Sequence, residues 1–145
     1  MLIELDEFLN KIMGAKFAPN GRDYQSIDCF GIIYLCYRDV LGIELKEYRD
    51  IFTENNPQML LRVAEVMKDA RSEWETASQI REFDMINIRT GRHAFHVGLA
   101  LNDKQMLHAD DICGVVVEDL SNPLWKNRID WIYRHKYMKG YLRYA

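Results

Sequence analysis

Apolar residues follow two different periods along this chain, and that change limits its possible folds more than any other feature. As far as Met67 they recur three or four residues apart, which is the spacing of one face of a helix. Beyond residue 80 they alternate with polar residues, which is the spacing of a half-buried strand. Helices followed by strands, rather than alternating with them, predict an α+β fold.

Three helices are expected in the first half. The first is indicated by six apolar residues at helical spacing and can end at Gly14: Leu2, Leu5, Phe8, Leu9, Ile12 and Met13. A polar loop over 18–26 precedes a second helix over 28–41, for which Ser26 and Asp28 are both plausible N-caps. Gly42 suits the end of that helix, and a third helix is predicted to begin at Pro57 and run through Met67.

Five strands are expected after residue 80, at 84–89, 94–101, 105–109, 115–118 and around 129–134. Short polar breaks at 90–92 and 102–104 suit hairpin turns. These features predict N-terminal helices packed on an antiparallel meander, within a single domain spanning residues 1–145.

Composition argues for an ordinary globular protein, since 48% of the residues are hydrophobic and 28% are charged. The formal net charge of -3 gives neither the basic surface of a nucleic-acid binder nor a general attraction to anionic membranes. The apolar runs are too short to span a bilayer, and acidic residues interrupt the apolar N-terminus, unlike in a secretory signal. We therefore expect no nucleic-acid partner, no transmembrane segment, and synthesis in a cytoplasm without a signal peptide.

Cys29 is the cysteine whose position favours chemistry. It lies at the start of the helix predicted for 28–41, where unpaired N–H groups and the helix dipole lower the pKa of a thiol. Gly31 would leave space beside the sulfur for an acyl group. A small core residue is the commoner explanation for a cysteine taken alone. Cys36 is about 10 Å further along that helix, beyond disulfide reach, and with Cys113 is interpreted as an ordinary residue.

A histidine on a predicted strand can supply the base that a nucleophilic cysteine needs. His96 shares a strand face with Gly98 and Ala100, two small residues that would let the cysteine helix pack closely on that face. A hairpin centred on residues 102–103 would bring His108 beside His96, where it could orient and polarise the base. A hydrogen-bonded surface histidine is the commoner explanation for a single residue of this kind.

His93 and His96 form an HxxH pair, which raises a metal site as an alternative. On a strand that odd spacing places the two side chains on opposite faces, and neither CxxC nor HExxH accompanies them. We therefore predict no metal and no cofactor, with His93 as a turn residue near the entrance of the site.

Together these segments resemble the NlpC/P60 cell-wall peptidases, a branch of the papain-like cysteine hydrolases. Residues 28–32, DCFGI, resemble the family's Asp-Cys-Ser/Trp-Gly-Leu element, which opens a helix and carries the nucleophile. Residues 96–99, HVGL, resemble the His-Val-Gly-Ile strand of the base, and residues 107–109, LHA, resemble the segment of the third polar residue. Phe83 departs from the Gly-Asp-Leu/Val pattern that the family has at this point. The resemblance covers roughly residues 1–135.

The resemblance implies a papain-like NlpC/P60 fold with a triad of Cys29, His96 and His108. It implies that Cys29 attacks a stem-peptide amide of peptidoglycan, the D-glutamyl–diaminopimelate bond, and forms a thioester. His96 would be the general base and acid, and His108 would hold its tautomer.

Other site residues follow from the same resemblance. Phe17 stands where many bacterial members have a tyrosine that helps to hold the oxyanion, and losing one such donor costs about 10²–10³-fold in rate. Tyr24 or backbone N–H groups near the cysteine would replace it. The predicted oxyanion- and substrate-binding residues are Tyr24, Asp28, Arg22 and Arg92. Arg22, Arg89 and Arg92 suit stem carboxylates through bidentate pairing, with solvated loop charges as the open alternative.

The closer likeness is to the phage tail-assembly branch of the family. It is carried by residues 14–17 (GAKF), 20–23 (NGRD) and 131–134 (WIYR). It implies phage tail proteins as partners and a place in the virion tail, with action in the periplasm or cell wall of a bacterial host. A structural tail-tip protein with a weak or vestigial hydrolase site remains an alternative, and an acyltransferase with the same cysteine chemistry is a third.

Overall fold

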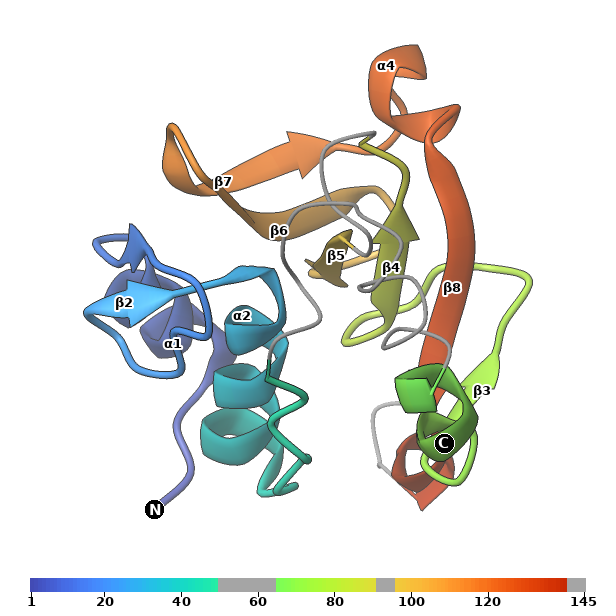
Figure 1. The fold of residues 1–145 in the computed structure, drawn as a ribbon, viewed down its shortest axis with the longest axis horizontal. Helices are drawn as coiled ribbons and strands as arrows, with labels where there is room; N and C mark the ends of the chain where they lie inside the picture. The colour runs from blue at the N-terminus through green and yellow to red at the C-terminus, as the bar shows by residue number, and fades with distance from the viewer. Residues whose placement is uncertain (50–64, 91–95, 141–145) are drawn as a thin grey trace.

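The fold is α+β, as the sequence predicts, in a computed structural model that describes residues 1–49, 65–90 and 96–140. Figure 1 shows α1 and α2 on one side of a sheet built from the second half of the chain. The elements are α1 (Leu5–Ile12), β1 (Lys16–Phe17), β2 (Ser26–Ile27), α2 (Cys29–Cys36), the π-helix η1 (Tyr37–Leu41), β3 (Trp74–Thr76), β4 (Met85–Ile88), β5 (His96–Ala100), β6 (Gln105–Asp110), β7 (Gly114–Asp119), α4 (Pro123–Lys126), β8 (Ile129–His135) and the 3₁₀-helix η2 (Lys136–Gly140).

The main sheet has the strand order β3-β8-β4-β5-β6-β7, and every pair of neighbours in it is antiparallel. The predicted meander is confirmed for β4 to β7, which lie side by side in chain order. β8 does not continue it: this strand returns across the sheet and pairs with β4, so that β7 is left at the edge. The short strand β3, which the sequence did not reveal, pairs with the far side of β8.

Two predicted segments lie partly outside the described residues. The helix expected to begin at Pro57 can be followed only from residue 65, and residues 65–70 are helical. Most of the turn expected at 90–92 also falls outside. Across the described ranges, none of the helices has the length and apolar character needed to cross a membrane.

The helix α2 forms in a sequence that is apolar almost all round, as expected for a helix at the centre of a core. Asp28 is its N-cap, because its side chain accepts a hydrogen bond from the Gly31 N–H at 2.8 Å. The helical path continues through η1 and ends at Gly42, whose φ of 71° lies in the left-handed region. The predicted cap and end of this helix are confirmed, while the π-helical last turn was not foreseen.

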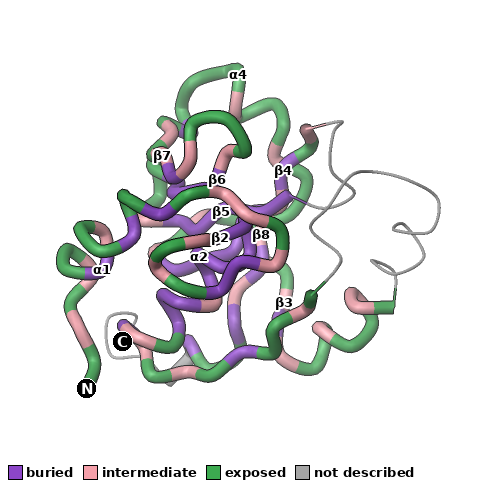
Figure 2. Tube along the Cα trace, turned by 60° about the vertical axis from the view of Figure 1, so that its left-hand side comes forward, coloured by how far each residue is buried: buried purple, intermediate pink, exposed green. Residues whose placement is uncertain are grey.

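Two apolar clusters lie on opposite faces of the sheet. The larger one joins α1 and α2 to the face of the central strands that carries Val97, Leu99 and Leu107. The smaller one contains Ala100 and Met106, on the other face. In Figure 2 the buried part of the trace is concentrated in α2 and the central strands, while α4 and the outer loops are exposed. The site residues of the central strands therefore lie between two packed layers.

Candidate functional site

Cys29 is the first residue of α2 and is almost fully buried, with 3% of its surface exposed. Burial raises the pKa of its thiol far above the ordinary value, and the neighbouring Asp28 charge raises it further. Hydrogen bonds with the backbone of Val97 and Phe30 and the charge of Arg22 act in the opposite direction but do not prevail. The pKa of Cys29 is therefore shifted upward, opposite to the lowering expected at a helix start, because burial is the largest cause of the shift.

The hydrogen bond with Val97 also fixes where the thiol lies. Val97 directly follows His96 at the start of β5, so the sulfur lies beside the strand that carries the predicted base. The helix start and the strand start, 67 residues apart in sequence, meet here because α2 packs on the central strands.

His96 and His108 lie together, as the predicted hairpin required. Nε2 of His96 is 3.1 Å from Nδ1 of His108, and the two rings meet edge to face. Their exposed fractions are 6% and 2%. The pairing of Leu99 with Leu107 centres the hairpin on Asp103, half a residue beyond the predicted centre. The two histidines are therefore diagonal neighbours rather than direct cross-strand partners, which long side chains can still bridge.

The strand face that packs on α2 is not the one predicted from the small residues. Val97 and Leu99 pack against the helix, whereas Ala100 belongs to the cluster on the opposite face. A Cβ at Gly98 would lie 2.3 Å from the sulfur of Met106, so the small residue there makes room for a neighbouring side chain and not for the helix. The sequence showed the alternation of faces but not which face meets the helix.

Gly31 also has a different role from the one predicted. A Cβ at this position would lie 2.3 Å from the carbonyl oxygen of Gly21 and 2.6 Å from a side-chain carbon of Ile27. The preceding loop therefore fills the space next to Gly31. The expectation that this space is open to an acyl group is wrong. The absence of a side chain allows residues 18–28 to pack directly on the start of α2.

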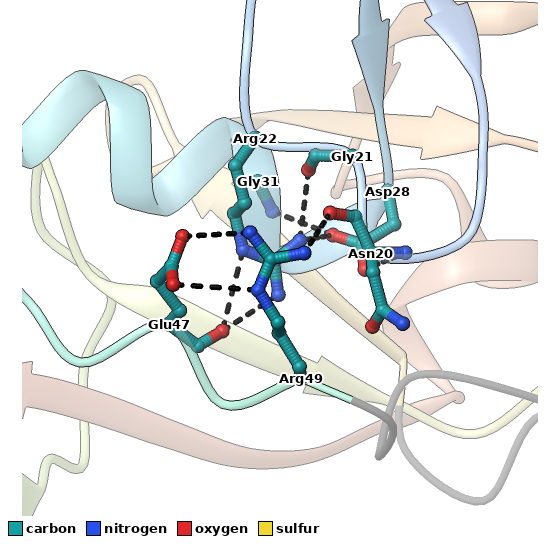
Figure 3. Close-up of polar contacts among 7 residues, drawn as sticks. All are labelled: Asn20, Gly21, Arg22, Asp28, Gly31, Glu47 and Arg49. Atoms are coloured by element: carbon teal, nitrogen blue, oxygen red, sulfur yellow. Dashed lines mark hydrogen bonds and ion pairs between the residues drawn. The ribbon is translucent and has the colours of Figure 1, made fainter.

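Arg22 and Asp28 form an internal network (Figure 3). Nη1 of Arg22 donates to a carboxylate oxygen of Asp28 and to the Gly21 carbonyl at 2.8 Å, while Nη2 donates to the Glu47 carbonyl at 2.7 Å. The Asp28 carboxylate also accepts from the Asn20 N–H at 3.2 Å. Both side chains are buried, at 8% and 1% exposure, so they join the loop to α2 and to the segment after η1. Their predicted substrate contacts receive no support from this geometry.

Tyr24 is bound to side chains of α1 and η1. Its hydroxyl donates to Asp39 of η1 at 2.5 Å, and its ring packs against Phe8 and under Lys11. Burial, followed by the hydrogen bond to Asp39, raises the pKa of this phenol. The one hydroxyl hydrogen is thus committed to a carboxylate, and replacement of the family tyrosine at Phe17 by Tyr24 stays an unsupported prediction.

Of the two remaining arginines, Arg89 lies within the described residues and Arg92 does not. Arg89 is mostly exposed and holds two strands together, with Nη1 2.5 Å from a carboxylate oxygen of Asp130 and Nη2 donating to the Asn127 carbonyl at 2.7 Å. Arg92 and His93 lie outside the described residues, so the predictions made for them stay untested.

Two neighbours of His108 were missed by sequence reasoning. Nε2 of His108 lies 3.4 Å from a carboxylate oxygen of Glu118 on β7, and the Trp125 ring of α4 meets the imidazole edge to face at 5.0 Å. Burial lowers the pKa of His108, and the Glu118 carboxylate partly raises it again. The signal for Glu118 was its place on the strand after His108, but the register that joins them is not readable from either strand alone.

Comparison with known proteins places this site in a family context. The family model described as the NlpC/P60 family matches residues 14–134. The murein DD-endopeptidase MepS/murein LD-carboxypeptidase of Escherichia coli strain K12 is 26% identical over 115 residues, which make up 79% of this chain and 53% of that protein. A probable endopeptidase of Haemophilus influenzae strain Rd is 27% identical over 123 residues, which make up 83% of this chain and 66% of that protein. The chain thus spans about half to two thirds of the length of these relatives.

Solved structures share the fold. The NlpC/p60 domain of the peptidoglycan hydrolase SagA superposes with a TM-score of 0.59 and 18% identity, covering 89% of this chain and 94% of that one. A lipoprotein-like protein of the NLP/P60 family from Staphylococcus aureus Mu50 gives a TM-score of 0.56 and 24% identity, covering 90% of this chain and 39% of that one. At these identities the likeness establishes the architecture.

Proposed function

Since this chain belongs to the NlpC/P60 family, we propose that it is a cysteine endopeptidase that hydrolyses an amide of peptidoglycan stem peptides. Two observations carry the proposal. The Cys29 thiol at the start of α2 is hydrogen-bonded with the backbone of Val97, the residue after His96, and Nε2 of His96 lies 3.1 Å from Nδ1 of His108. The names of the similar murein and peptidoglycan enzymes support the substrate class.

The proposed mechanism begins from a protonated thiol, because burial raises the pKa of Cys29. His96 removes the thiol proton as the sulfur attacks the substrate carbonyl, and a new C–S bond forms. The His96 imidazolium then protonates the leaving amine as the C–N bond breaks, leaving a thioester on Cys29. Water attacks the thioester, His96 again accepts a proton and returns it to the sulfur, and the free acid departs.

We assign the oxyanion to the backbone N–H of Cys29 at the start of α2, since the Gly31 N–H of the same turn donates to Asp28. The first N–H groups of a helix have no acceptor inside the helix, and they point toward an anion placed at its N-terminus. The alternative donor, Tyr24, gives its hydroxyl hydrogen to Asp39. With Phe17 unable to donate, we expect a slower enzyme than relatives that have a tyrosine at that position.

The finer substrate assignment is the D-glutamyl–diaminopimelate bond, taken from the resemblance of residues 28–32, 96–99 and 107–109 to the family motifs. The test uses purified diaminopimelate-type muropeptides and mass spectrometry of the products. Wild-type protein should release the peptide beyond the D-glutamyl residue, and Cys29→Ala should release it at least about 10³-fold more slowly.

Cys113→Ala is the matched control, since this cysteine is exposed, whereas Cys29 is buried. It should retain the wild-type rate. Absence of product with the wild-type protein, or equal release by Cys29→Ala, would contradict the proposal.

We also propose that the protein works as part of a phage tail, on the resemblance of residues 14–17 and 20–23 to the tail-assembly branch.

A specific observation favours a second candidate function, a structural tail-tip protein with a weak hydrolase site: Cys29 is only 3% exposed and its pKa is raised. Phage that carry Cys29→Ala separate the two. Intact tails that infect poorly favour the enzyme, whereas intact and fully infective particles favour the structural protein.

A further inference from the structure

Three side chains on adjacent strands form a diagonal line across one face of the sheet. The register of β5 and β6 places His108 two residues before the position opposite His96, and Glu118 lies two residues after Val116, the cross-strand partner of His108. Because neighbouring strands are antiparallel, both offsets point toward the same end of the sheet. The strands β5, β6 and β7 are neighbours in that order (Figure 1). The line begins at His96, one residue before Val97, whose backbone is hydrogen-bonded with the Cys29 thiol, and it ends at the edge strand of the sheet.

Polar contacts join the three side chains in series. Nε2 of His96 lies 3.1 Å from Nδ1 of His108, and Nε2 of His108 lies 3.4 Å from Oε1 of Glu118. The His108 side chain is 3% exposed and the Glu118 side chain 28% exposed. Trp125 packs against the His108 ring, which helps to hold the imidazole in the plane that both contacts need.

The Glu118 carboxylate at the outer end of this series determines which ring nitrogens carry protons. A carboxylate can only accept a hydrogen bond, and a neutral imidazole has one N–H. If His108 donates Nε2–H to Glu118, its Nδ1 has a free lone pair and accepts from Nε2–H of His96. His96 then has no proton on Nδ1, so Nδ1 is the nitrogen that would accept the thiol proton of Cys29.

We propose that Glu118 is a positioning residue that sets the tautomers of both histidines and thereby directs the unprotonated nitrogen of His96 to Cys29. This inference rests on the proposed function for its catalytic consequence, but the tautomers exist whether or not the protein turns over a substrate. Glu118 does not touch the reacting atoms; it acts through His108.

A second effect of Glu118 concerns charge. When His96 accepts the thiol proton, the positive charge is stabilised through His108 by the Glu118 carboxylate. Asp110 on β6 also interacts electrostatically with both histidines. Its carboxylate should therefore still stabilise the positive charge of His96 in part when Glu118 is replaced. Removing Glu118 alone should therefore weaken the imidazolium without abolishing it.

The direct test is ¹⁵N NMR of the histidine rings in the full chain at pH 7.5. In wild type, both His96 and His108 should be protonated at Nε2. In Glu118→Ala, the Nδ1–H form of His108 should become populated. Glu118→Gln should keep the wild-type tautomers, because its amide oxygen still accepts from Nε2–H, and so serves as the rescue variant.

The control is Asp119→Asn, which removes one charge from the next residue of β7 while its side-chain oxygen still accepts from Ser121. It should leave both tautomers unchanged. Wild-type tautomers in Glu118→Ala, or a change of equal size in Asp119→Asn, would overturn the inference.

Kinetics on a muropeptide substrate give the second readout. Glu118→Ala should lower kcat about tenfold with KM unchanged, and the acid limb of kcat/KM should move to lower pH by about half a unit to one unit. An inactive wild type contradicts the proposed function and leaves the NMR result to decide the tautomers. An active wild type with unchanged kcat in Glu118→Ala contradicts the inference alone.

Discussion

At the scale of single residues, the Cys29 thiol lies between two opposing influences. The helix start, the backbone of Val97 and the charge of Arg22 favour the thiolate, while burial and the Asp28 carboxylate favour the thiol. Burial raises the pKa of this thiol more than the Val97 contact and the Arg22 charge lower it, so the protonated thiol is favoured in the free protein. A proton acceptor is then needed in the same step as attack, which agrees with the placing of His96.

This balance predicts slow alkylation of Cys29. At pH 7.5, iodoacetamide should modify the exposed Cys113 at least about tenfold faster than Cys29, because the thiolate is the reacting species and Cys29 is both protonated and buried. Mass spectrometry of peptides taken at successive times measures both rates in one sample. Faster modification of Cys29 than of Cys113 would show a preformed thiolate and contradict the pKa direction.

At Phe83 the backbone conformation destabilises the folded protein, while the burial of the side chain stabilises it. Its φ of 74° lies in the left-handed region, at the position where the family pattern has glycine, yet its ring is fully buried. Loss of a buried phenylalanine side chain costs about 3–5 kcal/mol, whereas the backbone strain costs about 1–2 kcal/mol. The side chain therefore outweighs the strain.

Two substitutions at Phe83 separate the cost of losing the buried ring from the cost of the backbone strain. Phe83→Gly should reduce the free energy of unfolding by about 1–4 kcal/mol, since the gain from relieved strain offsets only part of the lost burial. Phe83→Ala loses the ring and keeps the strain, so it should be about 1 kcal/mol less stable than Phe83→Gly. Urea unfolding measures both; a more stable alanine variant would contradict the assignment of strain.

At the scale of elements, the start of α2 depends on one carboxylate. Asp28 caps the Gly31 N–H and neutralises the buried Arg22, which in turn holds the Glu47 backbone. The helix, the loop over 18–28 and the segment after η1 therefore meet at a single side chain. Its geometry explains the acidic residue before the cysteine without a contact to substrate.

Replacing that carboxylate should destabilise the protein strongly. Asp28→Ala should lower the free energy of unfolding by about 3–5 kcal/mol, because it leaves the Arg22 charge buried without its partner. Asn122→Ala, which removes the cap of the exposed helix α4, is the matched control and should cost about 1 kcal/mol. Equal losses in the two variants, measured by urea unfolding, would show that the buried ion pair contributes nothing beyond capping.

At the scale of the whole molecule, His135 couples stability to pH. It is buried at the end of β8 against Trp74 and Tyr37, and burial lowers its pKa to about 4. A histidine in an unfolded chain titrates near pKa 6.5. Between these values the unfolded chain binds a proton that the folded protein does not, so the free energy of unfolding decreases as the pH falls from about 6.5 to about 4.

The variant His135→Gln should remove this part of the pH dependence. Between pH 7 and pH 4, wild type should lose up to about 3 kcal/mol more than the variant. Tyr137→Leu removes the ring stacked on His135 without removing the titrating group, so its pH dependence should match wild type. The check is urea unfolding at a series of pH values, and parallel curves for wild type and His135→Gln would exclude the coupling.

Much of the architecture could be read from local patterns in the sequence. The start of α2 at Asp28 and its end at Gly42, and the strands β4 to β8 within one or two residues, follow from apolar spacing and from capping. These signals depend on neighbours a few residues apart, so the chain carries them wherever it folds. The hairpin that joins His96 to His108 is also a local feature, since one short turn sets its register. Its centre lies half a residue from the predicted position.

The sequence by itself therefore determined the α+β class, the helix that begins at Cys29 and the pairing of two histidines. Only the tertiary structure decided which strand face meets α2, what fills the space beside Gly31, and that Glu118 reaches His108. It also decided the protonation of the Cys29 thiol, against the local expectation. The reason is common to all four: each depends on what packs against a residue from far along the chain, and sheet order and burial are properties of the assembled layers rather than of any segment.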